Sequence, residues 1–269
     1  MDAMTIDLDT PKIRARIEDG IGWLTFNQPE KRNAISLSMW EAIAGVADRF
    51  ATDPNVRVVV MHGAGGKAFA SGADISEFDK ARDSAEAEGR YSAISSMARK
   101  RLEAMDKPLI AMIQGFCIGG GMATAMVADI RISAEDGRFG IPAAKLGVAY
   151  AYHSLRRLVW LAGPAIAKEI MFSGRQLDAA EALRVGLVNR VVPVSELEAV
   201  TTELAHAIAR NAPLSIRASK EAIDQISGDP VRADEARFDA LYRACFDSAD
   251  YAEGRAAFMA KRAPVFTGR

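Results

Sequence analysis

Three consecutive glycines, Gly119 to Gly121, separate an apolar run from an alanine-rich, helix-forming run in the segment IQGFCIGGGMATAMVADI (113–130). Glycine loses more conformational freedom on folding than any other residue, so a triplet predicts special backbone angles or a close approach to the main chain. Taken alone, it indicates tight packing more often than catalysis. GFCIGGG lacks the GxGxxG spacing and no Gly-Lys-Ser/Thr follows it, which excludes two nucleotide-binding motifs. We interpret the triplet as a place where the backbone contributes the chemistry.

The N-terminal half of the chain predicts strands that alternate with helices. The runs KIRARI (12–17) and IGWLTFN (21–27) flank an Asp-Gly turn and predict a β-hairpin. Ser38 and Glu41 have the spacing of a capping box, so we expect a helix to begin there. Alternating strands and helices indicate an α/β architecture. Further strands are predicted at 56–62, 108–115 and 129–133, and a helical stretch at about 84–105.

The chain changes character after Pro164, where predicted helices follow one another. Capping boxes begin at Asp178 and Ser195, and one short strand is predicted between them. We therefore divide the chain into a core, 1–195, and a C-terminal helical region, 196–269. Such a helical tail often packs on a neighbouring subunit.

Composition excludes several classes of function. With 34 basic and 35 acidic residues the net charge is −1, so no global field favours nucleic acid or an anionic membrane surface. No apolar run reaches the roughly 20 residues that span a bilayer, and the N-terminus resembles neither a secretory signal nor a transit peptide. Cys117 and Cys245 lie in apolar surroundings typical of reduced thiols. These features predict a soluble cytoplasmic protein that binds neither nucleic acid nor membrane.

A second stretch, FASGADISEF (69–78), also places small residues in a loop before a predicted helix. Two such loops can aim two main-chain N–H groups at one point, which is the geometry of an oxyanion hole. An oxyanion hole stabilises negative charge that develops on a carbonyl oxygen. Asp74 is expected to cap the helix that follows rather than to act in catalysis.

Several motifs resemble those of one enzyme family when they are taken in order along the chain. They are NQPEKRNAIS (27–36), FASGADI (69–75), GFCIGGG (115–121), FGIPAAKLG (139–147), GRQLDAAEALRVGLVNRVVP (174–193) and the C-terminal FMAKRAPVFTGR. The chain is similar to the enoyl-CoA hydratase/isomerase family, the crotonase superfamily, over nearly its whole length. This resemblance implies a crotonase-like spiral of ββα units and a C-terminal helical region that mediates trimerisation. It also implies acyl-CoA substrates of fatty acid metabolism, no other cofactor, and a homotrimer or a dimer of trimers.

The resemblance assigns ligand-binding roles to seven positions. The two oxyanion N–H groups of the family correspond to Ala73 and Gly120, and a glycine lets its amide approach a thioester oxygen without a side chain in between. Arg32 matches a basic position near the CoA phosphates, although the run PEKR is equally typical of a solvated surface. The other positions are Ala34 and Ala70, whose backbone lines the CoA channel in relatives, and Phe258 and Lys261, near the adenine end, sometimes of a neighbouring subunit.

The same resemblance identifies two side chains that are missing. Hydratases of the family use paired glutamates, one to activate water and one to protonate the α-carbon. The matching positions are Ala123, within GGGMA, and Ala143, within FGIPA. Because alanine moves no proton, standard two-glutamate hydration is in doubt. Glu135 and Asp136 lie in a polar turn and are expected to be solvated rather than to replace the glutamates.

The loop LGVAYAYHS (146–154) offers another candidate catalytic group. In a methylmalonyl-CoA decarboxylase of the family, a tyrosine matches Tyr150, where a phenol can orient a carboxylate or protonate an enolate. His153 in the same loop is expected to have a structural role. His62 and His206 have no partner at metal-ligand spacing, so no metal is expected.

Three functions therefore stay open. The first is a hydratase-like lyase or isomerase that acts on acyl-CoA, with Tyr150 or a water in place of the glutamates. The second is a decarboxylase of malonyl-CoA-type thioesters, and the third is an acyl-CoA-binding protein without catalysis. Candidates for an acyl pocket, each equally typical of ordinary core, are Phe78, Met97, Met122 and Tyr152.

Overall fold

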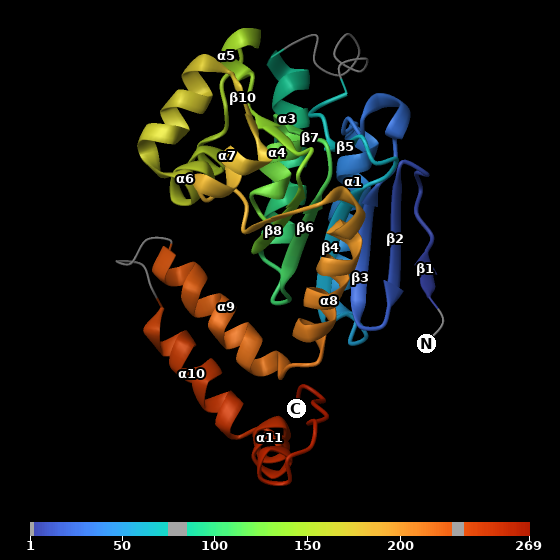
Figure 1. Ribbon diagram of the computed structural model, residues 1–269, viewed down its shortest axis with the longest axis vertical. Coiled ribbons are helices and arrows are strands. Elements are labelled where there is room, and N and C mark those ends of the chain that lie inside the picture. The colour runs from blue at the N-terminus through green and yellow to red at the C-terminus, as the bar shows by residue number, and fades with distance from the viewer. Residues whose placement is uncertain (1–2, 75–84, 228–233) are drawn as a thin grey trace.

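The structure, a computed structural model, describes residues 3–74, 85–227 and 234–269. Within these residues the strands form two sheets, which helices surround (Figure 1). The larger sheet consists, in spatial order, of β1 (Met4–Ile6), β2 (Ile13–Glu18), β3 (Ile21–Phe26), β4 (Val58–Gly63), β6 (Leu109–Ile113), β8 (Ile130–Ala134) and β11 (Arg190–Val192). The smaller sheet consists of β10 (Gln176–Asp178), β9 (Arg138–Gly140), β7 (Phe116–Ile118) and β5 (Ala68–Ala70).

Helices connect and cover these sheets. They are η1 (Pro29–Lys31), α1 (Leu37–Thr52), α3 (Ala85–Glu103), α4 (Gly120–Ala125), α5 (Ala143–Leu146), α6 (Tyr152–Ser173), α7 (Ala179–Arg184), η3 (Val194–Glu196), α8 (Leu197–Ala209), α9 (Pro213–Ser227), α10 (Glu235–Phe246) and α11 (Ala249–Met259). Helix α6 contains a break at Gly163, whose φ of 76° is not helical, directly before Pro164. Proline lacks the N–H that would continue the helical ladder, so the break falls at this pair.

A repeating order of elements builds the body of the molecule. Strands β4, β6 and β8 are parallel neighbours in the larger sheet, and each leads into a short strand of the smaller sheet, β5, β7 and β9 in turn. The next described helices along the chain are α3, α4 and α5. Three successive ββα units confirm the predicted α/β fold, a crotonase-like spiral.

The predicted hairpin is formed by β2 and β3, which pair antiparallel around Asp19 and Gly20, with φ of 48° and 83°. These left-handed angles suit a tight hairpin turn. The predicted start of the first helix was displaced by two residues, because Ser36 and not Ser38 accepts the capping bond from the Met39 amide (3.3 Å). Both serines are chemically able to cap, and the backbone of Ser36 is extended, as a cap requires.

The other two predicted caps had opposite outcomes. Asp178 accepts a hydrogen bond from the Glu181 amide (2.8 Å) and begins α7, as predicted. The prediction for Ser195 was wrong, because this residue lies in the 3-10 turn η3 and α8 begins at Leu197 without a side-chain cap. The 3-10 turn continues directly into α8, so the helix begins from an already turned backbone and not from an extended serine cap.

Hydrophobic cores lie on both faces of the larger sheet. On one face α1 and the smaller sheet contribute buried side chains such as Trp40 and Phe69, and the Phe69 ring meets Phe26 edge-on at 5.0 Å. On the other face Trp23 and its neighbours pack against α8. The first core fixes the smaller sheet against the larger one, and this contact positions the loops that follow β5 and β7.

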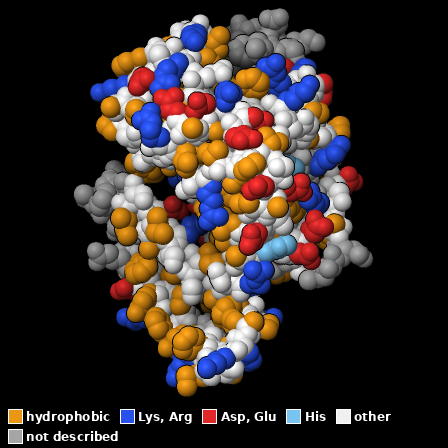
Figure 2. All heavy atoms as spheres, in the orientation of Figure 1, with side chains coloured by type: hydrophobic (Ala, Val, Ile, Leu, Met, Phe, Trp, Pro, Cys, Tyr) orange, Lys and Arg blue, Asp and Glu red, His pale blue; other side chains and the backbone are white. Residues whose placement is uncertain are grey.

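The C-terminal arm, residues 213–269, extends from the body and consists of α9, α10 and α11 in its described part (Figure 1). Helix α8 packs on the larger sheet, whereas the arm exposes large apolar side chains (Figure 2). They include Ile223, Ile226, Tyr242, Phe246, Phe258 and Met259. None of the helices in the described ranges combines the length and the apolar character that crossing a bilayer requires.

Candidate active site

The three glycines at the junction of β7 and α4 differ in their structural requirements. Gly119 has a φ of 53°, which other residues rarely adopt. A Cβ at Gly121 would lie 2.1 Å from the Ala70 carbonyl oxygen, so only glycine fits beside β5. Gly120 is different, because a Cβ there would make no contact shorter than 3.8 Å. Backbone conformation explains the glycine at 119 and close packing explains the one at 121. Neither explains why residue 120 is a glycine.

The amides of Ala73 and Gly120 lie side by side on two loops. A Cβ at Gly120 would lie 3.8 Å from the Ala73 nitrogen, and one at Gly72 would lie 3.9 Å from the Gly120 nitrogen. Within the described part of the chain, neither Ala73 nor Gly120 donates its N–H to another protein group. Backbone N–H groups are strong donors that folded proteins normally pair. The arrangement thus offers two adjacent donors to a ligand.

Backbone hydrogen bonds hold the Ala73 loop in place. The Ile35 amide donates to the Gly72 carbonyl (2.7 Å), and the Asp74 amide donates to the Ile35 carbonyl (3.1 Å). Asn33 adds a buried side chain, whose Nδ2 donates to the Ala68 carbonyl at 2.7 Å. These bonds join residues that lie about 35 positions apart in sequence, and they fix the orientation of the Gly72–Ala73 peptide.

Asp74 is buried beside this loop and is paired with a cation. Its carboxylate lies 2.9 Å from Lys31 Nζ and accepts a second bond from Gln28 Nε2 (3.1 Å). The helix that Asp74 was expected to cap falls on residues 75–84, outside the described ranges. The contacts that are described give Asp74 a structural role, tying η1 to the Ala73 loop.

Tyr150, in the segment before α6, contacts the loop that carries the Gly120 amide. Its hydroxyl donates to the Gly119 carbonyl oxygen at 3.0 Å. Burial raises the pKa of Tyr150, and the nearby charge of Arg99 opposes that rise. Tyr150 therefore keeps its proton at physiological pH and acts as a donor in this contact.

The two alanines at the positions that match the family's glutamates are buried. Ala123, in the first turn of α4, is 4% exposed, and Ala143, at the start of α5, is 5% exposed. Two carboxylates that follow α4 along the chain have structural partners. Asp129 accepts from the Leu109 amide (2.7 Å) and pairs with a lysine, and Asp136, in the turn predicted to be solvated, accepts from the Gly115 amide (3.1 Å).

Two of the three histidines have local explanations. His153 Nε2 lies 2.7 Å from Glu103, which Arg157 also contacts, in agreement with the structural role expected for His153. His62 Nε2 lies 2.8 Å from Thr25 Oγ1, and burial lowers the pKa of His62 to about 4. Across residues 3–74, 85–227 and 234–269, no three potential metal ligands among His, Cys, Asp and Glu are grouped.

The predicted CoA-binding positions fall into two places. Arg32 is exposed, stacks over the Phe116 ring at 4.7 Å, and accepts the Ser71 amide through its carbonyl, so it lies beside the Ala73 loop. Ala34 and Ala70 are buried in the same region. Phe258 is 83% exposed on α11, with Lys261 just after it, and the chain does not bring this helix to the Ala73 loop (Figure 1).

Of the four candidate acyl-pocket residues, Met122 belongs to the core at 1% exposure, whereas Met97 and Tyr152 are exposed. Phe78 lies outside the described residues.

Sequence reasoning missed several side chains around the site. Tyr91 on α3 donates to the Ile35 carbonyl (3.1 Å) and accepts a bond from Trp40 Nε1 (2.9 Å). Arg99, two turns further along α3, stacks over the Trp40 ring at 4.9 Å. Tyr91 and Arg99 are eight residues apart, which places them on the same face of a helix. This spacing alone could not identify them, because ordinary core and surface residues show it too.

Comparison with known proteins agrees with this architecture. The sequence profile described as enoyl-CoA hydratase/isomerase matches residues 16–269. A short-chain-enoyl-CoA hydratase of Clostridium acetobutylicum is 36% identical over 249 residues, covering 91% of this chain and 93% of that protein. A carnitinyl-CoA dehydratase of Salmonella typhi is 37% identical over 252 residues, covering 91% and 94%.

Solved structures give the same result. The structure of an enoyl-CoA hydratase/carnithine racemase from Magnetospirillum magneticum superimposes with a TM-score of 0.92 at 42% identity, covering 97% of both chains. A structure of enoyl-CoA hydratase from Bacillus anthracis reaches 0.89 at 30% identity, covering 96% of this chain. The chain is therefore a member of the enoyl-CoA hydratase/isomerase family of the crotonase superfamily.

Proposed function

We propose that the protein is an acyl-CoA enzyme that stabilises a thioester enolate between the amides of Ala73 and Gly120. The observation that carries this proposal is the adjacency of two N–H groups that lack a protein partner in the described chain. Preorganised donors of this kind are typically the largest single contribution to catalysis when charge develops on a carbonyl oxygen. The negative charge develops on the thioester oxygen of the substrate, so the reaction needs no covalent acyl-enzyme intermediate.

The reaction that relatives favour is hydration or dehydration at the β-carbon. In hydration, a water oxygen bonds to the β-carbon and loses one proton to a second water, while the π electrons of the C=C bond move toward the thioester oxygen. The enolate then takes a proton at the α-carbon, so the net change is the addition of one water. With Ala123 and Ala143 at the glutamate positions, the proton must pass through water or Tyr150. Names of the relatives, short-chain-enoyl-CoA hydratase and carnitinyl-CoA dehydratase, support this chemistry.

The second candidate is decarboxylation of a malonyl-CoA-type thioester. The C–C bond to the carboxylate breaks, CO₂ leaves, and the electron pair forms the same enolate, which then takes a proton at the α-carbon. This route needs no base, and alanine at both glutamate positions favours it for that reason. It uses the same oxyanion donors, with Tyr150 placed to orient a carboxylate or to protonate the enolate.

We further propose that CoA binds across the edge formed by Arg32, Ala34 and Ala70. Arg32 supplies charge and several donors for phosphate. The adenine end then needs Phe258 and Lys261 from another copy of the chain, since this chain's own α11 lies away from the site (Figure 1).

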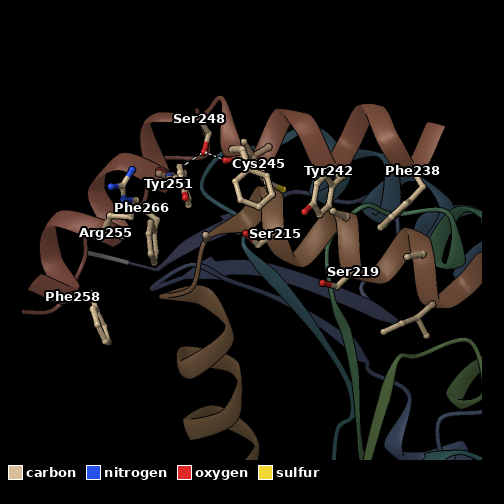
Figure 3. Close-up of a pocket in the computed structure, with 18 residues that line it drawn as sticks. Ser215, Ser219, Phe238, Tyr242, Cys245, Ser248, Tyr251, Arg255, Phe258 and Phe266 are labelled. Carbon is tan, nitrogen blue, oxygen red and sulfur yellow. Dashed lines mark hydrogen bonds between the residues drawn. The ribbon is translucent and has the colours of Figure 1, made fainter. Parts of the chain in front are cut away.

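The C-terminal arm supports self-association, as a homotrimer or a dimer of trimers. A cavity of about 790 Å³ opens between α9, α10 and α11, and aromatic side chains including Phe238, Tyr242 and Tyr251 line it (Figure 3). Large apolar side chains gathered on one exposed face, here including Tyr242, Phe246 and Phe258, mark an interaction surface in soluble proteins. Light scattering in solution is expected to give the mass of three or six chains, and a monomer would contradict this assignment.

A substrate panel tests the proposed function. Purified protein is incubated with crotonyl-CoA, longer enoyl-CoAs, carnitinyl-CoA and methylmalonyl-CoA, and the enoyl-thioester absorbance and CO₂ release are followed. Turnover of an enoyl or hydroxyacyl thioester supports hydration or dehydration, and CO₂ release supports decarboxylation. Tight binding without turnover of any of them supports a binding protein and contradicts the enzymatic proposal.

A further inference from the structure

Arg99 carries a positive charge that has no counter-charge among the described residues. The side chain is half-buried on α3, its Nη2 donates to Ser95 Oγ at 3.2 Å, and its guanidinium stacks on Trp40 at 4.9 Å. Among the described residues, no carboxylate forms an ion pair with it. Burial lowers the pKa of Arg99, which is the cost of removing the charge from water. A guanidinium has five N–H donors, so most of its capacity is left for another group.

Two tyrosines place this charge beside the candidate active site. Tyr150 donates to the Gly119 carbonyl of one donor loop, and Tyr91 donates to the Ile35 carbonyl, next to Ala73 in the other. Both tyrosines interact electrostatically with Arg99 and oppose the fall of its pKa. Arg99 therefore lies close to the two phenols that contact the donor loops.

These surroundings differ from those that a plain fatty acyl chain prefers. A saturated chain gains its binding energy from apolar contacts and gains nothing from a guanidinium or a phenol. A carboxylate gains charge-assisted hydrogen bonds from a guanidinium and can accept a bidentate pair from arginine. The single O–H donors of Tyr91 and Tyr150 are already used on the loop carbonyls, so Arg99 supplies this contact. The missing counter-charge is thus one that a ligand can bring.

We propose, on the basis of the proposed function, that Arg99 binds a carboxylate on the acyl group, so that the preferred substrates are CoA thioesters of dicarboxylic acids. The thioester oxygen lies at Ala73 and Gly120 while the far carboxylate meets Arg99. A carboxylate at the far end of the acyl group is not attached to the α-carbon, so breaking its C–C bond would give no enolate, and the group is retained through the reaction rather than expelled as CO₂. The inference therefore favours hydration or dehydration over decarboxylation.

Matched saturated thioesters test the inference without turnover. Valeryl-CoA and glutaryl-CoA have the same chain length and differ in a terminal methyl or carboxylate, and hexanoyl-CoA and adipoyl-CoA repeat the comparison with one more carbon. Dissociation constants are measured by calorimetry on the full chain. The wild type is expected to bind the dicarboxylic thioester of at least one pair about tenfold more tightly, the gain of one charge-assisted contact.

Substitutions of Arg99 test whether this residue causes the preference for dicarboxylic thioesters. Arg99→Met is expected to remove it while valeryl-CoA binding changes little, and Arg99→Lys is expected to keep part of it because the charge remains. Arg101→Met is the control, since Arg101 is on the same helix and pairs with Asp48 away from the site. If Arg99→Met does not fold, the wild-type preference and Arg99→Lys decide.

Two results would overturn the inference. Equal or weaker binding of the dicarboxylic thioesters by the wild type, or an unchanged preference in Arg99→Met, excludes Arg99 as the carboxylate partner and leaves the proposed function intact. Absence of binding for all four thioesters contradicts the proposed function and the inference together.

Discussion

The Tyr150 hydroxyl donates a hydrogen bond to the Gly119 carbonyl oxygen, 3.0 Å away, and this carbonyl belongs to the same peptide unit as the Gly120 N–H. The peptide is trans, so the N–H points away from the side that Tyr150 contacts. The Ala123 amide donates to the same carbonyl (2.9 Å). In the other loop the Ile35 amide contacts the Gly72 carbonyl, on the peptide that carries the Ala73 N–H. Hydrogen bonds to a carbonyl polarise its peptide, which strengthens the opposite N–H as a donor.

Tyr150→Phe tests what the phenol contributes. We expect turnover to fall much more than CoA affinity, because the hydroxyl acts where charge develops. A loss of about tenfold in kcat fits peptide polarisation, worth roughly 1 kcal/mol, and a loss of about 10²-fold or more fits proton donation. Steady-state kinetics with the best substrate of the panel measure both. Tyr152→Phe is the matched control, since Tyr152 is 81% exposed, and an unchanged kcat in Tyr150→Phe would remove Tyr150 from the site.

Gly120→Pro removes one of the two proposed donors with little change in the fold. Gly120 is the first residue of α4, a position where proline is well tolerated because its N–H is not needed by the helix. Loss of one oxyanion donor typically lowers kcat by about 10²–10³-fold. Activity assays combined with thermal melting separate the chemistry from stability. Near-normal turnover in the folded variant would exclude the Gly120 amide from catalysis.

Gly121→Ala is predicted to act through packing alone. The new Cβ would lie 2.1 Å from the Ala70 carbonyl, a backbone atom that cannot move freely, so the free energy of unfolding falls by about 1–3 kcal/mol or more. Gly45→Ala is the comparison, because Gly45 is in α1 with open space around it and alanine favours a helix by about 0.5–1 kcal/mol. Urea denaturation of both variants measures the contrast. Equal stability of the two would show that Gly121 has room for a side chain.

Features that depend on neighbouring residues could be predicted from the sequence, whereas features that depend on contacts between distant residues could not. The hairpin and the buried strand β4 followed from local patterns, a turn dipeptide and a β-branched run. The glycine triplet predicted a backbone site, and the structure places the Gly120 amide beside that of Ala73. Strands β5, β7, β9 and β10 have three residues each, too few to show a period, so the smaller sheet was not predicted.

Polar residues of the site were hardest to identify in advance. Asn33 is fully buried and bonds to Ala68, 35 residues away, yet in sequence it belongs to a charged run that reads as surface. Ser36 and Ser38 are both competent caps, and the extended backbone at Ser36 decided between them. Arg99 is one of several charges on a polar helical stretch, and only the tertiary structure shows that it has no carboxylate partner within residues 3–74, 85–227 and 234–269.

Stability is predicted to decrease at mildly acidic pH through His62. Burial, aided by the charge of Arg16, lowers the pKa of His62 from its ordinary 6.5 to about 4. Between these values the unfolded chain binds a proton that the native chain does not, so the free energy of unfolding falls as pH drops, by at most about 1.4 kcal/mol per pH unit. His62→Gln keeps a polar contact to Thr25 without titrating. Denaturation at several pH values is expected to show a shallower slope for this variant, and identical slopes would contradict the assignment.

The most direct measurement is a crystal structure of the protein with a saturated acyl-CoA bound. The account predicts that the thioester oxygen accepts hydrogen bonds from both the Ala73 and the Gly120 amide nitrogens, at about 2.7–3.2 Å. A thioester oxygen that faces away from these amides, or amides that bond to other groups once the ligand is in place, would contradict it.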